Sequence, residues 1–207
     1  MSTSDKSIDP KLLKSAKKEF LKHGFLDAEL KTICDNAGIT TGAVYKRYKG
    51  KEELFCAVVK DAVDMLTDYV HLRPESEPSS LTDEQLVASW KMNEDGTLEL
   101  FKMLWEHRES FRLLISRSAG TRYGNFKHDF AEEMCRSTEV SYNELKKRGL
   151  AKTDISAAEL HVLCSSFWTS VYEPFEHSMK WEEIKLHCKL MCRFFDWSAV
   201  IGILERK

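Results

Sequence analysis

The sequence has few of the residues that interrupt regular structure. Its 207 residues include only 9 glycines and 4 prolines, too few for a β-sandwich or barrel with its frequent turns. No apolar run approaches the roughly 18 residues that a membrane-spanning helix needs. The N-terminus is polar and rich in lysine, so we expect no export signal. The six cysteines form no C-x-x-C pair and are expected to be reduced. A cytoplasmic, mostly helical protein is therefore expected.

Apolar residues recur at helical spacing along the whole chain, and the alternation typical of strands is nowhere sustained. Asp9 and Pro10 suit the start of the first helix, and Gly24 suits its end. The predicted helices lie at about 10–23, 29–36, 40–47, 51–66, 81–93, 97–118, 125–148, 155–178 and 181–204. The segment Arg73–Ser80 holds two prolines and three serines and is predicted to be a linker or mobile loop. The predicted fold class is all-α.

Charge divides the chain into two parts. Residues 1–60 contain 12 basic and 8 acidic side chains, a net charge of +4, whereas residues 61–207 contain 19 and 25, a net charge of −6. A basic segment on an acidic protein suggests a polyanionic partner for that segment. A lysine-rich, solvated helix face explains the same charge equally well.

The segment from Leu30 to Tyr45 has the pattern of a helix-turn-helix, which we place at about residues 29–48. Ala37, Gly38 and Ile39 supply in order the small residue, the turn glycine and the apolar residue that a tight helical corner needs. Thr40 can cap the second helix through its hydroxyl. Small residues at the start of that helix would let it enter the major groove of DNA.

Residues 10–60 resemble the DNA-binding domain of the TetR (AcrR-type) family of bacterial repressors. The matching positions are Ala16, Phe20, Gly24, Phe25, Ile33, Ala37, Gly38, Ile39, Gly42, Tyr45, Tyr48, Lys51 and Leu54. The chain departs from the family at Ala28-Glu29, where Thr or Ser is usual, and at Cys34, where alanine is usual. Tyr48 keeps the aromatic character of its position but replaces the common phenylalanine. The resemblance implies a three-helix DNA-binding domain at residues 1–60, followed by a helical ligand-binding and dimerisation domain at residues 61–207.

The resemblance also implies which residues bind duplex DNA. The predicted contacts are Thr40, Thr41, Gly42, Ala43, Tyr45, Lys46 and Lys51. Residues 40–42 would approach base edges, and Tyr45 would place its hydroxyl on a phosphate. Lys46 could reach a phosphate or a guanine, and Lys51 would bind phosphate at the start of the next helix.

The last two predicted helices are apolar over too wide an arc for a surface helix that buries one face. In the TetR family, the last two helices pair with their copies across a two-fold axis, which implies a homodimer here. The residues predicted at that interface are Phe167, Val171, Phe194, Trp197 and Ile201. The alternative is that both helices lie at the centre of a monomer.

Aromatic residues are concentrated after residue 60 and could line a cavity for a flat apolar compound. The residues predicted there are Trp90, Phe101, Trp105, Phe111, Trp168 and Tyr172. Plain core packing explains each of them individually, whereas the resemblance favours a pocket among the helices at 97–118, 125–148 and 155–178.

Motifs of catalysis and of cofactor binding are lacking. The sequence contains no P-loop, dinucleotide fingerprint or nucleophile elbow, so we expect no enzyme activity, catalytic residue, cofactor or metal. His161 and Cys164, and Cys188 and Cys192, have spacings that could place two metal ligands on one helix face, but such pairs also arise by chance.

Together these patterns predict a dimeric, TetR-like repressor that is released from a palindromic operator by a small apolar or aromatic molecule. A regulator of the same fold that is switched by a protein partner, or that has no ligand, is the main alternative. A helical enzyme and a redox or metal sensor are weaker ones.

Overall fold

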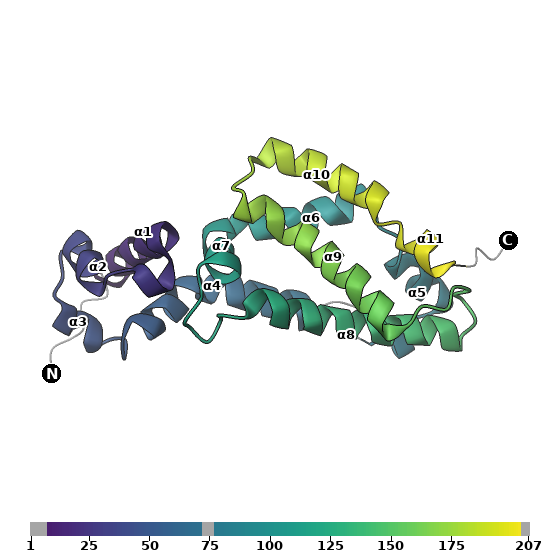
Figure 1. The fold of residues 1–207 in the computed structure, drawn as a ribbon, viewed down its shortest axis with the longest axis horizontal. Coiled ribbons are helices and arrows are strands. Elements are labelled where there is room, and N and C mark those ends of the chain that lie inside the picture. Colours follow the sequence, from purple (N-terminus) through teal and green to yellow (C-terminus); the bar gives the residue numbers. More distant parts are fainter. Residues whose placement is uncertain (1–7, 72–76, 204–207) are drawn as a thin grey trace. The chain divides into compact units, whose positions relative to one another are not determined.

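The all-α class is confirmed by the computed structural model, which describes residues 8–71 and 77–203 (Figure 1). Its helices are α1 (Ile8–Asp27), α2 (Leu30–Ala37), α3 (Thr41–Tyr45), α4 (Lys51–His71), η2 (Pro78–Ser80), α5 (Asp83–Ser89), α6 (Glu94–Glu106), α7 (Arg108–Ser116), α8 (Phe126–Lys147), α9 (Ala157–Glu176), α10 (Trp181–Phe194) and α11 (Trp197–Ile201). One isolated antiparallel bridge joins Ala151 to Ile203. Within these ranges, no helix has the length and apolar character needed to cross a membrane.

The chain forms two compact units, and the first contains two separate stretches of sequence. What we call the head unit comprises the residues up to Met65 together with His107–Lys127. The body unit comprises Leu66–Glu106 and the residues from His128 onward. The sequence prediction divided the chain once, at residue 60, and so placed residues 107–127 in the second domain.

Three phenylalanines form the centre of the head unit. The ring of Phe20 on α1 lies 5.1 Å from that of Phe55 on α4 and 6.1 Å from that of Phe25, measured between centroids. Phe25 reaches this cluster because Gly24 adopts φ +75° and ψ 174°, which interrupts the helical path of α1 where the sequence predicted its end. The core of the head unit is thus built around the turn that leads into α2.

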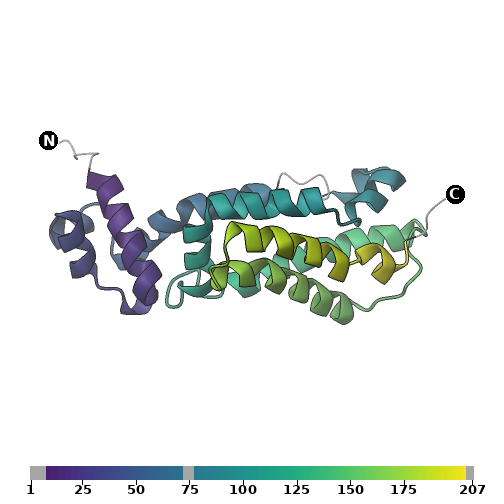
Figure 2. The ribbon, with the colours of Figure 1, turned by 90° about the horizontal axis from the view of Figure 1, so that it is seen from above.

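In the body unit, α6 and α10 lie side by side, and α8 and α9 run through the same bundle (Figures 1 and 2). A buried cluster includes Leu86, Tyr142 and Leu160 from three different helices. The Tyr142 hydroxyl donates to the carbonyl of Thr153 at 2.7 Å and accepts from the Ile155 amide at 2.9 Å. These bonds tie the loop before α9 to α8.

Two long predicted helices are in fact divided. The helix predicted at 97–118 is split at His107, whose φ of −105° and ψ of 15° turn the chain between α6 and α7. The helix predicted at 181–204 ends at Phe194, and Asp196 caps α11 by accepting from the Ala199 amide at 3.0 Å. Residues 73–76 of the predicted linker and Leu204 lie outside the described residues, whereas Pro78–Ser80 forms the short helix η2.

Candidate nucleic-acid interface

The turn between α2 and α3 has the geometry of a helix-turn-helix. Gly38 ends α2 in the left-handed conformation, with φ 69° and ψ 35°, which a side chain would disfavour. The amide of Ile39 donates to the carbonyl of Cys34 at 3.1 Å, and so satisfies a free carbonyl at the end of the helix. Thr40 then caps α3 as predicted, because its hydroxyl accepts from the Ala43 amide at 3.2 Å.

Buried residues hold this turn in place and leave one face of α3 at the surface. Ile33 and Val44 are fully buried, and the Ser15 hydroxyl donates to the carbonyl of Ile33 at 2.8 Å. Five of the predicted DNA contacts are exposed, whereas Ala43 is half-buried; the five are Thr40, Thr41, Gly42, Tyr45 and Lys46. Tyr45 is 61% exposed, unusual for a large aromatic residue with a core role. The short helix therefore presents hydroxyl, ammonium and phenol groups together.

Two basic residues near α3 have partners within the protein. The Nε of Arg47, which follows the predicted DNA contact Lys46, lies 2.8 Å from Oδ1 of Asp9 on α1. Lys51 was predicted to bind phosphate, but its Nζ donates to the carbonyls of Leu26 and Ala28 at 3.0 and 2.9 Å and lies 4.7 Å from the centroid of the Phe25 ring. Lys51 thus stabilises the turn that leads into α2, and its contact with DNA stays a prediction.

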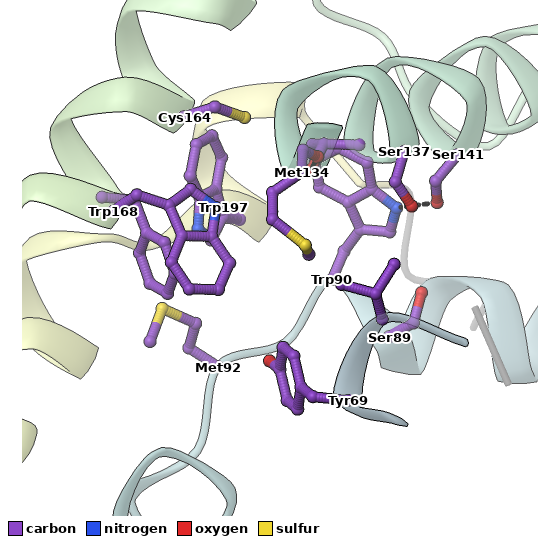
Figure 3. Close-up of a pocket in the computed structure, with 13 residues that line it drawn as sticks. Tyr69, Ser89, Trp90, Met92, Met134, Ser137, Ser141, Cys164, Trp168 and Trp197 are labelled. Carbon is purple, nitrogen blue, oxygen red and sulfur yellow. Dashed lines mark hydrogen bonds between the residues drawn. The ribbon is translucent and has the colours of Figure 1, made fainter. Parts of the chain in front are cut away.

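The body unit contains a cavity of about 180 Å³ (Figure 3). Its walls come from five segments, and the lining residues are Tyr69, Val70, Ser89, Trp90, Met92, Met134, Ser137, Thr138, Ser141, Cys164, Phe167, Trp168 and Trp197. The lining includes no acidic, basic or histidine side chain. The indole Nε1 of Trp90 donates to the Ser141 hydroxyl at 2.9 Å. This lining suits an uncharged aromatic molecule, because a charge would have no partner there.

Only two of the six predicted pocket residues, Trp90 and Trp168, line this cavity. Phe101 is fully buried and stacks on Phe175, with ring centroids 6.0 Å apart. Trp105 packs against Trp181 at 5.5 Å. Tyr172 is buried, and its ring lies 6.3 Å from that of Trp168.

Phe111, also predicted in the pocket, is buried within the head unit. These four residues do not line this cavity, and aromatic character alone does not distinguish a core residue from a cavity wall. Tyr69, Met92, Met134 and Trp197 were missed, because nothing in the local sequence indicates where their segments meet.

The five residues predicted at the dimer interface differ in their exposure. Val171 and Ile201 are fully buried within the chain, so neither presents surface to a second copy. Phe167 and Trp197 are half-buried and pack on one another, with ring centroids 6.3 Å apart. Phe194 alone of the five is exposed, at 81%. Two of its neighbours on α10, Leu186 and Leu190, are exposed as well.

Comparisons with known proteins agree with the geometry of the head. Residues 12–58 match the family model described as "Bacterial regulatory proteins, tetR family". The N-terminal domain is a TetR-family domain. The predicted resemblance is thus confirmed over the helix-turn-helix. No curated protein sequence matches the chain.

Solved structures extend the similarity in fold to the whole chain. NalD, the secondary repressor of the MexAB-OprM multidrug efflux pump in Pseudomonas aeruginosa, is 18% identical with a TM-score of 0.58, and the match covers 99% of this chain and 100% of NalD. MexZ, a repressor from the same organism, is 13% identical with a TM-score of 0.60, covering 97% and 100%. SCO3833 from Streptomyces coelicolor A3, a member of the TetR transcriptional regulator family, is 16% identical with a TM-score of 0.61, covering 94% and 91%. The chain thus has the fold of a TetR-family transcriptional regulator.

The helix pairs that suggested metal ligands are engaged otherwise. Within residues 8–71 and 77–203, no three His, Cys, Asp or Glu side chains lie close enough together to hold a metal ion. His161 Nε2 lies 3.4 Å from the Ser165 hydroxyl. Burial raises the pKa of the Cys188 thiol to about 11, and the neighbouring Cys192 adds to the shift.

Proposed function

We propose that this protein is a DNA-binding transcriptional repressor that acts as a homodimer on a palindromic operator and is released by an uncharged aromatic molecule. The observation that carries the proposal is the capped helix α3, which presents Thr41, Gly42 and Tyr45 at the surface of a helix-turn-helix. The TetR-like domain over residues 12–58 also supports DNA binding.

We infer that α3 enters the major groove through its N-terminal end. Thr and Gly offer few hydrogen bonds to base edges, so recognition would depend on the methyl group of Thr41 and on the shape of the DNA. The exposed Tyr45 hydroxyl would donate to a phosphate and fix the register of the helix on the duplex. Tyr45→Phe should therefore weaken operator binding without changing the stability of the fold.

The homodimer is supported by an apolar row on α10. Leu186, Leu190 and Phe194 are spaced four residues apart, so they share one face of the helix, and all three are exposed. Such a row on a soluble protein marks an interaction surface. A second copy of the chain would cover it, and the dimer would then place two α3 helices on half-sites about 34–36 Å apart.

Phe194→Glu tests the dimer, because a carboxylate in the row would oppose its burial. We expect light scattering to show a dimer for the wild-type protein and a monomer for the variant. Val140→Glu is the matched control, since Val140 is an exposed apolar residue on α8 and should leave the dimer intact. A wild-type monomer would contradict this part of the proposal.

The cavity in the body unit supports release by a small ligand. Three of the five tryptophans line it, so a bound aromatic molecule should change the tryptophan fluorescence. Binding and DNA release are coupled reciprocally, and a coupling of about 1–3 kcal/mol would weaken operator binding roughly 5- to 150-fold. A cavity already open in the described chain favours a ligand over a switch by a protein partner.

The decisive experiment is footprinting of the purified protein on the DNA upstream of its own gene, followed by a screen of uncharged aromatic compounds. We expect a symmetric footprint, and at least one compound that changes the fluorescence and releases the DNA. The absence of specific binding at low salt would overturn the proposal. A compound that binds the cavity tightly without changing operator affinity would remove the release mechanism and leave DNA binding intact.

A further inference from the structure

The loop between α7 and α8, residues 117–125, belongs to the head unit although it lies far from the helix-turn-helix in sequence. The amide of Phe25 donates to the carbonyl of Arg117 at 3.0 Å. The amide of Arg122 donates to Oε1 of Glu52, in the first turn of α4, at 2.9 Å. These two bonds attach the loop to the end of α1 and to the start of α4.

The loop approaches α1 closely, at a position where the backbone conformation favours glycine. Gly120 has φ +87°, and a Cβ built there would lie 2.4 Å from Cδ2 of Leu26. Leu26 belongs to the turn that Lys51 binds, since its carbonyl is one of the two that accept from Lys51 Nζ. The loop therefore lies beside the turn that leads into α2.

Hydrogen bonds within the loop fix its conformation. The Thr121 hydroxyl donates to the carbonyl of Ser118 at 2.7 Å and accepts from the Tyr123 amide at 3.0 Å. The Gly124 amide donates to the carbonyl of Thr121 at 2.9 Å. Arg122 is thus held on a defined loop, and its side chain is 60% exposed.

The return of this segment makes the head unit strongly basic. Residues 107–127 contain five basic side chains and one acidic. With them, the head unit contains 17 basic and 11 acidic side chains, a net charge of +6, and the body unit contains 14 and 22, a net charge of −8. The difference in net charge between the two units is therefore larger than the difference between residues 1–60 and residues 61–207.

We propose that the 117–125 loop is a second contact with DNA, in which Arg122 binds the phosphate backbone beside the helix-turn-helix. In this motif the first helix crosses the backbone, so the turn before α2 lies near phosphates, and the loop packs against that turn. Arg122 also lies next to the first turn of α4, where the helix dipole favours an anion. Its Nε is 3.6 Å from Oε1 of Glu52, an exposed pair that a phosphate can displace.

This inference rests on the proposed DNA binding and predicts a specific salt dependence. Each phosphate contact adds about 0.9 to the slope of log affinity against log salt concentration. Arg122→Gln should therefore lower the slope on a random-sequence duplex by about 0.9 per protomer, measured between about 50 and 200 mM salt. Arg122→Lys should restore it, because the charge is kept.

Three further measurements separate charge from structure. Arg136→Gln is the matched control, because Arg136 is 66% exposed and pairs with a single glutamate in the body unit, and its slope should equal that of the wild type. Thermal unfolding should show the same midpoint for Arg122→Gln and the wild type. Asn125→Lys, which adds a charge at an exposed position of the loop, should raise the slope.

The possible results separate this inference from the proposed function. A wild-type protein that binds no duplex at any salt concentration would overturn both. Normal binding by the wild type, with unchanged slopes for Arg122→Gln and Asn125→Lys, would overturn the loop contact alone and assign Arg122 a purely structural pairing with Glu52. A lowered slope that Arg122→Lys restores would support the contact.

Discussion

The head and body units build their candidate sites in different ways. The predicted DNA contacts of the head lie within residues 40–51, and hydrogen bonds between near neighbours in the sequence shape the helix that carries most of them. The cavity of the body is lined by residues from Tyr69 to Trp197, contributed by several helices and their connections. A site made by local geometry can be found in a sequence, whereas a site made by the meeting of distant segments leaves no local signature.

The two units also differ in chemistry. The head presents hydroxyl and basic groups to solvent and carries a net charge of +6, whereas the body encloses a cavity with uncharged walls. The head therefore suits a polyanion, and the body suits a small apolar molecule. If this division is real, substitutions in one unit should leave the property of the other unchanged.

The largest expected effect is the destabilisation of the head unit by Phe20→Ala. Phe20 is fully buried between Phe25 and Phe55, and its truncation should cost about 3–5 kcal/mol of stability. All five tryptophans lie in the body unit, so their fluorescence reports on the body alone. In urea, we expect circular dichroism to show an early loss of helix while the fluorescence midpoint stays near that of the wild type.

Tyr45→Ala is the control for Phe20→Ala, because the exposed side chain of Tyr45 should contribute within about 0.5 kcal/mol to stability. If the circular dichroism and fluorescence midpoints shifted together in Phe20→Ala, the two units would unfold as one, and the expected independence of the head and body units would be wrong.

The next largest effect should come from Trp90→Phe in the body. The substitution removes the donor to the buried Ser141 hydroxyl and should cost about 1–3 kcal/mol. Adding Ser141→Ala should recover part of the loss, because no unsatisfied group remains. Urea unfolding, followed by the fluorescence of the remaining tryptophans, measures the stability of the single and the double variant. Duplex binding should be unaffected. A double variant as unstable as the sum of its parts would argue against the bond.

A smaller effect is expected for Thr40→Ala at the start of α3. Loss of the cap to the Ala43 amide should cost about 1 kcal/mol, and Thr40→Ser should retain most of it. Circular dichroism of the unfolding head provides the measurement. Thr41→Ala, at the neighbouring exposed position, is the control and should leave stability nearly unchanged. Equal losses at both positions would mean that the cap contributes little.

The smallest effect is confined to alkaline pH. Burial raises the pKa of the Cys164 thiol to about 12, and the nearby Cys135 adds to the shift. The unfolded thiol ionises near its ordinary value of about 8.5, so this stabilisation is complete below that pH and is lost as pH rises toward the folded value. Urea unfolding at neutral and alkaline pH should show a smaller loss for Cys164→Ala than for the wild type. Identical losses would exclude Cys164 as a contributor.

The sequence by itself determined the helical class and the helix-turn-helix. Gly38 and Thr40 could be interpreted without a structure because their roles depend on backbone geometry within a few residues. The same local reasoning failed at His107 and Asp196. There α6 and α10 end and new helices begin, although no glycine or proline indicates a helix end. Helical spacing continues across both breaks, so periodicity alone could not reveal them.

The tertiary structure alone decided which residues line the cavity, where Lys51 and Arg47 are engaged, and that residues 107–127 join the head. Trp90, Phe101 and Phe111 are alike in the sequence, but they lie in a cavity wall, in the core of the body and in the head. The physical reason is that burial favours any apolar side chain nearly equally. Its place is therefore set by the packing of distant segments, which composition and spacing do not encode.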